Sequence, residues 1–159
     1  MIAGVKTMKI RKATAEDERQ IIELLNQFPP SDQTTADVEA VRNTFHRIIE
    51  NSELGSILVA EENGDVIATI ALSYPTAMHC GGLYTCIEDF IVAEQARGRG
   101  VGGQLVKAAI AEATEKGCYE IQVNNPSDLG YPVYLRCGLT STGRHLRLKL
   151  KRQEPENRK

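Results

Sequence analysis

Apolar residues recur along the chain at spacings of about 3.6 and about 2 residues, the periods of an amphipathic helix and of a strand. The stretch 8–13 (MKIRKA) predicts a short first strand. Thr14 and Asp17 stand at the spacing of a capping box, which predicts that a helix begins there. Isoleucines and leucines then keep helical spacing to Leu25, and the prolines from Pro29 onward predict the end of this helix.

The next segment predicts a second helix and then a hairpin. Thr34 and Asp37 repeat the helix-start signal, and apolar residues keep helical spacing to about residue 50. The pattern then changes to two strand-like runs within 56–74, separated by Asn63-Gly64. Because this dipeptide is typical of two-residue hairpin turns, the two runs are expected to pair in antiparallel fashion.

The second half of the chain alternates between strand-like and helix-like patterns. Leucines at every second position predict the last strand, and the charged segment that follows it is expected to be frayed. The predicted elements are, in order, a loop (75–82), a strand (83–92), a helix from about Gly102 that Gly117 caps, a strand (118–123), a short helix (131–137), a strand (145–150) and a tail (151–159).

The order of these elements predicts the fold class. Hairpin strands followed by a strand–helix–strand unit imply a mixed central β-sheet flanked by helices on both faces. The chain has 159 residues, enough for one domain with a substantial core. We therefore expect a single α/β domain of the mixed α+β type over residues 1–150, with the charged tail 151–159 outside it.

Composition narrows the classes of function. A net charge of −2 argues against a protein that binds nucleic acid through bulk electrostatics. No apolar run approaches the roughly 18–20 residues that a membrane span needs, and the N-terminus lacks the apolar block of a signal peptide. We expect a cytoplasmic protein without membrane or nucleic-acid partners. The cysteines show no paired spacing, which favours buried reduced thiols over a metal site.

The glycine cluster ARGRGVGG (96–103) is the candidate site for chemistry. It follows an apolar strand and precedes a helix, which is the arrangement that offers backbone amides to a phosphate. Gly98, Gly100 and Gly103 also satisfy the dinucleotide pattern GxGxxG, but roughly 55 residues follow Gly103, too few for the rest of such a fold. A P-loop is excluded because no Gly-Lys-Ser/Thr follows.

Read from Arg97 to Gly102, the cluster fits the pattern [QR]-x-x-G-x-[GA]. This segment resembles the acetyl-CoA-binding motif of the GNAT family of N-acetyltransferases, and the order of the predicted elements is similar to the order in that family over residues 8–150. Physical logic agrees with the resemblance. Small residues let the chain approach a pyrophosphate closely, amides at a helix N-terminus bind it, and arginines add charge-assisted hydrogen bonds.

Shorter segments extend the resemblance. VYLRCGL (133–139) is similar to the recurrent FYEKxGF of the family, and it places Tyr134 on the family's tyrosine. CIEDFIV, GCYEIQV and VYLRCGL are similar to segments of glucosamine-6-phosphate N-acetyltransferases. At the position where the family often has asparagine, seven residues before the tyrosine, this chain has Ser127. The resemblance implies acetyl-CoA as the cofactor, bound by Phe90, Ile91, Val92, Arg97, Gly98, Arg99, Gly100, Val101, Gly102 and Gly103.

Acetyl transfer to an amine also requires proton transfers. Because only the neutral amine attacks, a base must accept its proton, and Glu88, placed just before the cofactor segment, is the first candidate. Asp89 is the second; in a regular strand it would face away from Glu88, and a β-bulge would remove that distinction. Tyr134 is the candidate acid for the departing thiolate. The resemblance implies a backbone amide near Ile91 or Val92 for the oxyanion, and His79 is a weaker acceptor-side candidate.

The sequence thus predicts an acetyl-CoA-dependent N-acetyltransferase that acts on a primary amine, by direct attack in a ternary complex. A small-molecule amine is the favoured acceptor, and a protein or peptide amine is the alternative within the enzyme class. A non-catalytic acyl-CoA-sensing module on the same fold is the alternative from another class. The resemblance also suggests a homodimer formed through the last strand.

Overall fold

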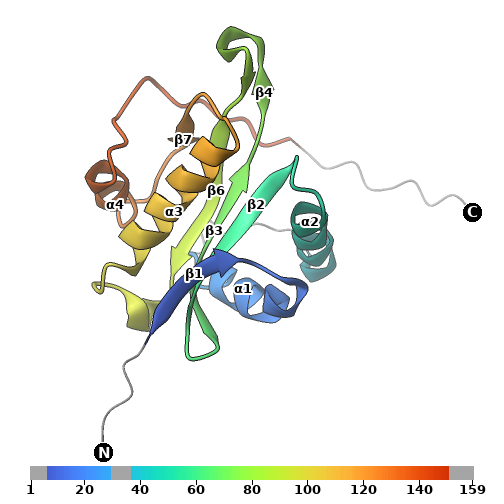
Figure 1. The fold of residues 1–159 in the computed structure, drawn as a ribbon, viewed down its shortest axis with the longest axis vertical. Coiled ribbons are helices and arrows are strands. Elements are labelled where there is room, and N and C mark those ends of the chain that lie inside the picture. The colour runs from blue at the N-terminus through green and yellow to red at the C-terminus, as the bar shows by residue number, and fades with distance from the viewer. Residues whose placement is uncertain (1–6, 30–36, 151–159) are drawn as a thin grey trace, which may run out of the picture.

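The computed structural model describes residues 7–29 and 37–150. They fold around one sheet of five strands, with a two-stranded hairpin beside it (Figure 1). The strands of the main sheet are β1 (Met8–Lys12), β2 (Gly55–Glu62), β3 (Asp65–Ser73), β6 (Thr85–Val92) and β7 (Ile121–Val123). The hairpin pairs β4 (Thr76–Ala77) with β5 (Gly82–Leu83), and the α-helices are α1 (Glu18–Leu25), α2 (Val38–Glu50), α3 (Val101–Glu115) and α4 (Tyr131–Arg136).

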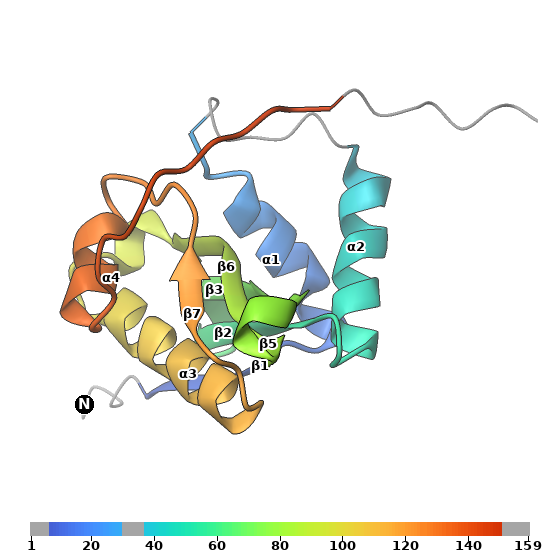
Figure 2. The same ribbon diagram turned by 90° about the horizontal axis from the view of Figure 1, so that it is seen from above.

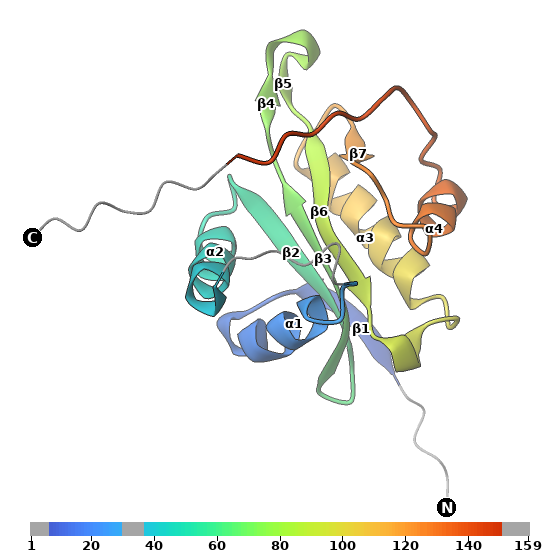
Figure 3. The same cartoon turned by 180° about the vertical axis from the view of Figure 1, so that it is seen from behind.

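The sheet is mixed, as the element order predicts. Its strand order is β1-β2-β3-β6-β7, with antiparallel pairs throughout except for the parallel pair of β6 and β7. Helices α1 and α2 lie on one face and α3 and α4 on the other (Figures 2 and 3). Central positions of β2 and β3 are buried on both faces, so these strands read as continuous apolar runs. The predicted fold class is therefore confirmed.

Several local signals produce the predicted structure. Asn63 and Gly64 have φ angles of 55° and 87°, as a two-residue hairpin turn requires. The Asp37 side chain caps α2 by accepting a hydrogen bond from the Ala40 amide at 2.7 Å. Gly117, with φ of 80°, follows the C-terminus of α3. The expectations for Pro30, Thr34 and the tail 151–159 concern segments outside the described residues.

The prediction of a last strand at 145–150 is wrong. The structure assigns no strand there, and Leu146, Leu148 and Leu150 are 92%, 82% and 82% exposed. Alternation favours a strand only where a neighbouring edge pairs with it and a layer covers its apolar face, and residues 7–29 and 37–150 provide neither to this segment. Dimer formation through the last strand stays a prediction.

Two further elements differ from the sequence expectation. The predicted loop 75–82 contains β4, a 3-10 turn (η2, Met78–Cys80) and the start of β5, which together form a projecting hairpin. The strand predicted at 118–123 is shorter and begins at Ile121, because the chain is still closing the end of α3 at Cys118, whose amide donates to the Ala113 carbonyl at 3.0 Å. In the described part of the chain, no helix is both long and apolar enough to cross a bilayer.

A partly buried network of ion pairs connects the turn after β1 to the sheet. Asp17 is 4% exposed and belongs to a 3-10 turn (η1, Ala15–Asp17) between β1 and α1. Arg11 on β1 donates to both Asp17 oxygens at 2.7 and 2.9 Å, and its Nε donates to Glu61 on β2 at 2.7 Å. Asp17 also accepts from the Thr14 amide at 2.7 Å, as the predicted capping box requires. These hydrogen bonds lower the pKa of Asp17, and the bonds from Arg11 have the largest effect.

Candidate functional site

The glycine loop joins the end of β6 to the start of α3, after a 3-10 turn (η3, Glu94–Ala96). Gly98 has φ of 74°, and Gly100, the N-cap residue of α3, has φ of 78°. Both angles lie in the left-handed region, where a Cβ is unfavourable and glycine is the ordinary residue. The predicted order of strand, glycine turn and helix is therefore confirmed.

Backbone amides point out of the N-terminus of α3. The Gly100 carbonyl accepts the first helical bond, from the Gln104 amide at 3.2 Å, so the amides of Val101, Gly102 and Gly103 come before it. A Cβ added at Gly98, Gly100 or Gly103 would meet no atom within 4 Å, which leaves the space in front of the loop open. Free amides and the helix dipole make this end of α3 suitable for an anion such as a pyrophosphate.

Gly102 has a different reason to be glycine. A Cβ there would lie 3.1 Å from Phe90 Cζ and 3.4 Å from Val92 Cγ2, both on β6. The missing side chain lets the first turn of α3 approach the strand closely. Gly102 therefore sets the distance between the helix N-terminus and the end of β6.

The arginines of the loop are held differently. Arg97 is exposed, and its Nε donates to the Val92 carbonyl at 3.0 Å, which leaves its two terminal nitrogens for another partner. The guanidinium of Arg99 forms an ion pair with the almost fully buried carboxylate of Glu62 at the end of β2. Arg99 thereby fastens the loop to the sheet, and Arg97 is the arginine better placed to add charge to a bound anion.

Strands β6 and β7 separate beside this loop. They pair only from Thr85 to Ile87, where β7 ends opposite at Val123, whereas β6 continues to Val92. In the described part of the chain, the stretch 88–92 has no strand partner on its β7 side. An unpaired strand edge can offer backbone groups to a ligand that lies along it.

The two candidate carboxylates meet at a β-bulge. Ala71 on β3 pairs with Asp89, and the next residue of β3 pairs with Ile87, so Glu88 has no partner of its own. Ser73 lies on the same sheet face as Ala71, and its hydroxyl donates to Glu88 Oε1 at 2.6 Å. Glu88 and Asp89 therefore share one face. The strand is not regular here, so the alternative with a β-bulge applies and the two carboxylates are not separated by the sheet.

The acidic pair alters the groups around it. Partial desolvation, with a smaller contribution from the charge of Glu88, raises the pKa of Asp89, although its side chain is still in contact with solvent. Burial, and then the nearby Glu88, raises the pKa of the Cys86 thiol to about 11. A thiol with that pKa stays neutral at pH 7 and is a poor nucleophile. This face therefore offers carboxylates as proton acceptors, and Cys86 is unsuited to covalent catalysis.

Tyr134 lies on the opposite face of β6. It is 5% exposed on α4, and its ring centroid is 5.5 Å from that of Phe90. Because Phe90 also contacts the position of Gly102, one aromatic ring joins the tyrosine to the glycine loop. Burial raises the pKa of Tyr134, so its hydroxyl stays protonated at neutral pH and can donate a hydrogen bond.

Other predicted residues have mainly local roles. Ser127 accepts a hydrogen bond from the Gly130 amide at 3.1 Å, so its hydroxyl closes the turn before α4. His79 is exposed in the turn between β4 and β5. All four cysteines are free thiols, but Cys86 alone is buried and the others are half-buried, which corrects the expectation that all of them are buried. Sequence reasoning missed Ser73, because nothing local shows that it faces Glu88.

The sequence and the fold are similar to those of known proteins. The sequence model described as the acetyltransferase (GNAT) family matches residues 19–139, which is most of the chain. The chain belongs to the GNAT family. The resemblance predicted from the glycine cluster is therefore confirmed, and the chain is an N-acetyltransferase of a family that uses acetyl-CoA.

Individual relatives support this membership. Glucosamine 6-phosphate N-acetyltransferase 1 of Oryza sativa subsp. japonica is 32% identical over 129 residues, which cover 78% of this chain and 75% of the rice protein. The crystal structure of glucosamine-6-phosphate N-acetyltransferase from Arabidopsis thaliana is 25% identical, with a TM-score of 0.77 over 92% of this chain and all of the other. A predicted acetyltransferase from Clostridium acetobutylicum, solved with acetyl-CoA, is 25% identical, with a TM-score of 0.76 over 90% and 96% of the two chains.

Proposed function

We propose that this GNAT protein transfers the acetyl group of acetyl-CoA to the primary amine of a small molecule, by direct attack within a ternary complex. The observation that carries the proposal is the unpaired edge of β6 beyond Ile87. On one face of this strand lie the carboxylates of Glu88 and Asp89, and on the other lie the glycine loop and Tyr134. Two substrates that approach from opposite faces would meet at this edge.

The residues of the glycine loop fit the donor. The pyrophosphate would bind the amides at the start of α3, with charge from Arg97, where the open space in front of Gly98 and Gly100 admits it. The remainder of acetyl-CoA would lie along the edge of β6, beside Phe90 to Val92. Bound there, acetyl-CoA supplies a thioester whose acetyl carbon is open to attack by an amine.

The carboxylate face supplies the base. An alkylammonium group has a pKa of about 10, so the incoming amine must lose a proton before it attacks. Glu88 is held by Ser73 and accepts this proton directly or through a water molecule, with Asp89 as the neighbouring second carboxylate. A backbone amide at Ile91 or Val92 stabilises the developing oxyanion. Because this amide belongs to a strand of the sheet, its position is fixed before the substrate binds.

Tyr134 assists the leaving thiolate. Its raised pKa makes it a weaker acid than a free phenol, so complete proton transfer to a thiolate with a pKa of about 8.5 is unfavourable. Its protonated hydroxyl can instead stabilise the thiolate with a hydrogen bond while solvent supplies the proton. Packing on Phe90 keeps the ring in one position for this purpose.

The relatives support a small acceptor. Proteins named as glucosamine 6-phosphate N-acetyltransferases resemble this chain both in sequence and in structure. An amino sugar is therefore the first acceptor to test. A peptide amine is the alternative acceptor within the enzyme class, and an acyl-CoA-sensing module is the alternative outside it.

Release of free thiol from acetyl-CoA tests the proposal, with amino sugars, amino acids, diamines and a lysine peptide as acceptors. We expect turnover with at least one small amine, and Glu88→Gln should lower kcat on the order of 100-fold without changing the Kd of acetyl-CoA. Glu39→Gln, at an exposed carboxylate on α2, is the control and should leave kcat unchanged. Turnover of the peptide alone would refute the small acceptor. Binding without turnover of any amine would favour the sensing module.

A further inference from the structure

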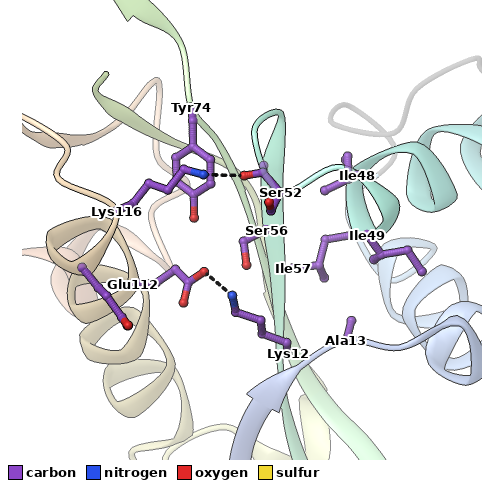
Figure 4. Close-up of a pocket in the computed structure, with 12 residues that line it drawn as sticks. Lys12, Ala13, Ile48, Ile49, Ser52, Ser56, Ile57, Tyr74, Glu112 and Lys116 are labelled. Atoms are coloured by element: carbon purple, nitrogen blue, oxygen red, sulfur yellow. Dashed lines mark hydrogen bonds and ion pairs between the residues drawn. The ribbon is translucent and has the colours of Figure 1, made fainter. Parts of the chain in front are cut away.

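A cavity lies at the other end of α3 from the glycine loop. Its volume is about 510 Å³, within the range of small-molecule sites. It is lined by the end of β1, the end of α2, the start of β2 and the last turns of α3 (Figure 4). None of the predicted catalytic or cofactor residues lines it.

The cavity arises because two neighbouring strands are unequal in length. The pairing of β1 with β2 ends where Lys12 meets Leu58, but β2 begins at Gly55. Over the described residues, the first positions of β2 therefore pair with β3 but have no strand on the β1 side, although Ala13 still donates to the Ile57 carbonyl at 2.8 Å. The ends of α2 and α3 lie on either side of this uncovered edge and leave a space between them (Figure 4).

Tyr74 brings an unpaired hydroxyl to this cavity. The residue lines the space but is only 6% exposed, and its hydroxyl makes no hydrogen bond of normal geometry among the described residues, although Ser56 and Glu112 lie near enough to affect its pKa. Burial, and then the charge of Glu112, raises the pKa of Tyr74 to about 12. Because a buried hydroxyl without a partner is unfavourable, this group favours a ligand that brings an acceptor.

The charged side chains that line the cavity carry equal numbers of positive and negative charges. Lys12 pairs with Glu112 at 2.9 Å. Lys116 donates to the Ser52 carbonyl and pairs with Glu53, each at 2.9 Å, and its Nζ lies 5.3 Å from the centre of the Tyr74 ring. The charged residues that line the cavity are two lysines and two glutamates, so the wall carries no net charge. A ligand with a net charge would leave part of this set unbalanced, whereas a zwitterion would not.

The opposite wall is apolar. Ile48 and Ile49 on α2 and Ile57 on β2 line it, and Figure 4 shows them across the space from Glu112 and Tyr74. A matching ligand therefore has a small zwitterionic head and an aliphatic tail. This combination describes a free α-amino acid with an aliphatic side chain.

We propose that this cavity is a second binding site, distinct from the acetyl-transfer site, for an aliphatic α-amino acid. The carboxylate of the amino acid accepts from the Tyr74 hydroxyl and from Lys12, its ammonium group donates to Glu112, and its side chain contacts the three isoleucines. Ser73 and Tyr74 are consecutive in an extended segment, so Tyr74 faces away from the side on which Ser73 holds Glu88. The site is therefore separate from the carboxylate face.

Calorimetry with the full-length protein tests the proposal, with L-leucine, L-isoleucine and L-valine as probes. We expect saturable binding of at least one of them to wild type. L-Leucinol, which lacks the carboxylate, and 4-methylpentanoate, which lacks the ammonium group, should bind at least tenfold more weakly. Tyr74→Phe should weaken binding about tenfold, because it removes one hydrogen bond from a buried group. Tyr119→Phe, at a tyrosine that is 67% exposed, is the matched control and should bind as wild type does.

Three results would overturn the proposal. One is the absence of binding heat with all three amino acids. Another is unchanged affinity in Tyr74→Phe. The third is affinity that Glu88→Gln abolishes and Tyr74→Phe preserves, since the amino acid would then occupy the acetyl-acceptor site. Thermal unfolding checks that Tyr74→Phe is folded. Its Tm without ligand should equal or exceed that of wild type, because the variant no longer buries an unpaired hydroxyl.

Discussion

The hydroxyl of Ser73 donates a hydrogen bond to Oε1 of Glu88 at 2.6 Å, across two strands that are out of register at that point. The bulge gives Glu88 no partner on β3, and Ser73 holds its carboxylate in one place. A base works best when its carboxylate is fixed before substrate arrives. Ser73 thus acts on the proposed chemistry through Glu88.

Replacing Ser73 should affect turnover more than binding. We expect Ser73→Ala to lower kcat about 3- to 10-fold, because the Glu88 carboxylate loses its anchor, while the Kd of acetyl-CoA stays the same. Ser73→Thr keeps the hydroxyl and should restore most of the rate. Steady-state kinetics with the best acceptor measures kcat for both variants. An equal loss of rate in the alanine and threonine variants would show that side-chain size matters, rather than the hydrogen bond.

The glycines at the two ends of α3 allow backbone strain to be separated from ligand binding. Gly100 and Gly117 have φ angles of 78° and 80°, and an added Cβ meets no atom within 4 Å at either position. Glutamate at either position should therefore destabilise the fold by about 1–2 kcal/mol. Only Gly100→Glu places a negative charge at the helix N-terminus, so it alone should weaken acetyl-CoA binding, by at least tenfold. Calorimetry and thermal unfolding measure the two effects, and equal affinity in both variants would refute the pyrophosphate site.

Removal of the Tyr134 hydroxyl tests its role as a donor to the leaving group. Tyr134→Phe retains the ring that packs on Phe90, so stability and the Kd of acetyl-CoA should change little. We expect kcat to fall about tenfold or more, since the hydroxyl acts only as the thiolate departs. Tyr131→Phe, at an exposed position of the same helix, is the control. An unchanged kcat in Tyr134→Phe would show that the tyrosine contributes only packing and does not act as a donor to the leaving group.

The ion pair of the buried Asp17 with the partly exposed Arg11 should make stability depend on pH. Hydrogen bonds from Arg11 lower the pKa of Asp17 in the folded state below its value in the unfolded chain. Their stabilisation is therefore fully present above about pH 4, and it disappears as the pH falls through the folded-state pKa. Asp17→Asn should lose about 2–3 kcal/mol at pH 7, and the difference from wild type should shrink on acidification.

Urea unfolding between pH 7 and the lowest pH at which both proteins fold measures this difference. Glu23→Gln is the control, because its ion pair with Arg19 is exposed and should contribute less than about 0.5 kcal/mol. A loss for Asp17→Asn that is as small as the loss for Glu23→Gln would contradict the assignment. A loss that does not change with pH would contradict it too.

Signals that act over a few residues could be predicted from the sequence. Asn63-Gly64 forms the hairpin turn, Asp37 caps α2, and the glycines from Gly98 form the turn before α3. In each case the backbone angles or the capping bond depend on residues that are adjacent in the chain. For the same reason the resemblance of the loop to a cofactor motif was visible in the sequence alone.

Contacts between distant segments could not be predicted. The alternating leucines of 145–150 favour a strand, but a strand forms only where another edge pairs with it, and the sequence does not say whether one is available. The sheet face on which Glu88 and Asp89 lie depends on a β-bulge, and the bulge is defined by the pairing of β6 with β3. The cavity beside Tyr74 arises from the unequal lengths of two paired strands.

The sequence by itself determined the order of the elements from β1 to β3 and from β6 to α4, the glycine turn with its exposed amides and the family to which the protein belongs. These properties follow from local backbone preferences and from the spacing of residues along one segment. Tertiary structure alone decided that both carboxylates share one face, that Ser73 holds Glu88, and that Phe90 joins Tyr134 to the glycine loop. Each of these depends on strand register and on packing between layers, which bring together residues that no local pattern relates.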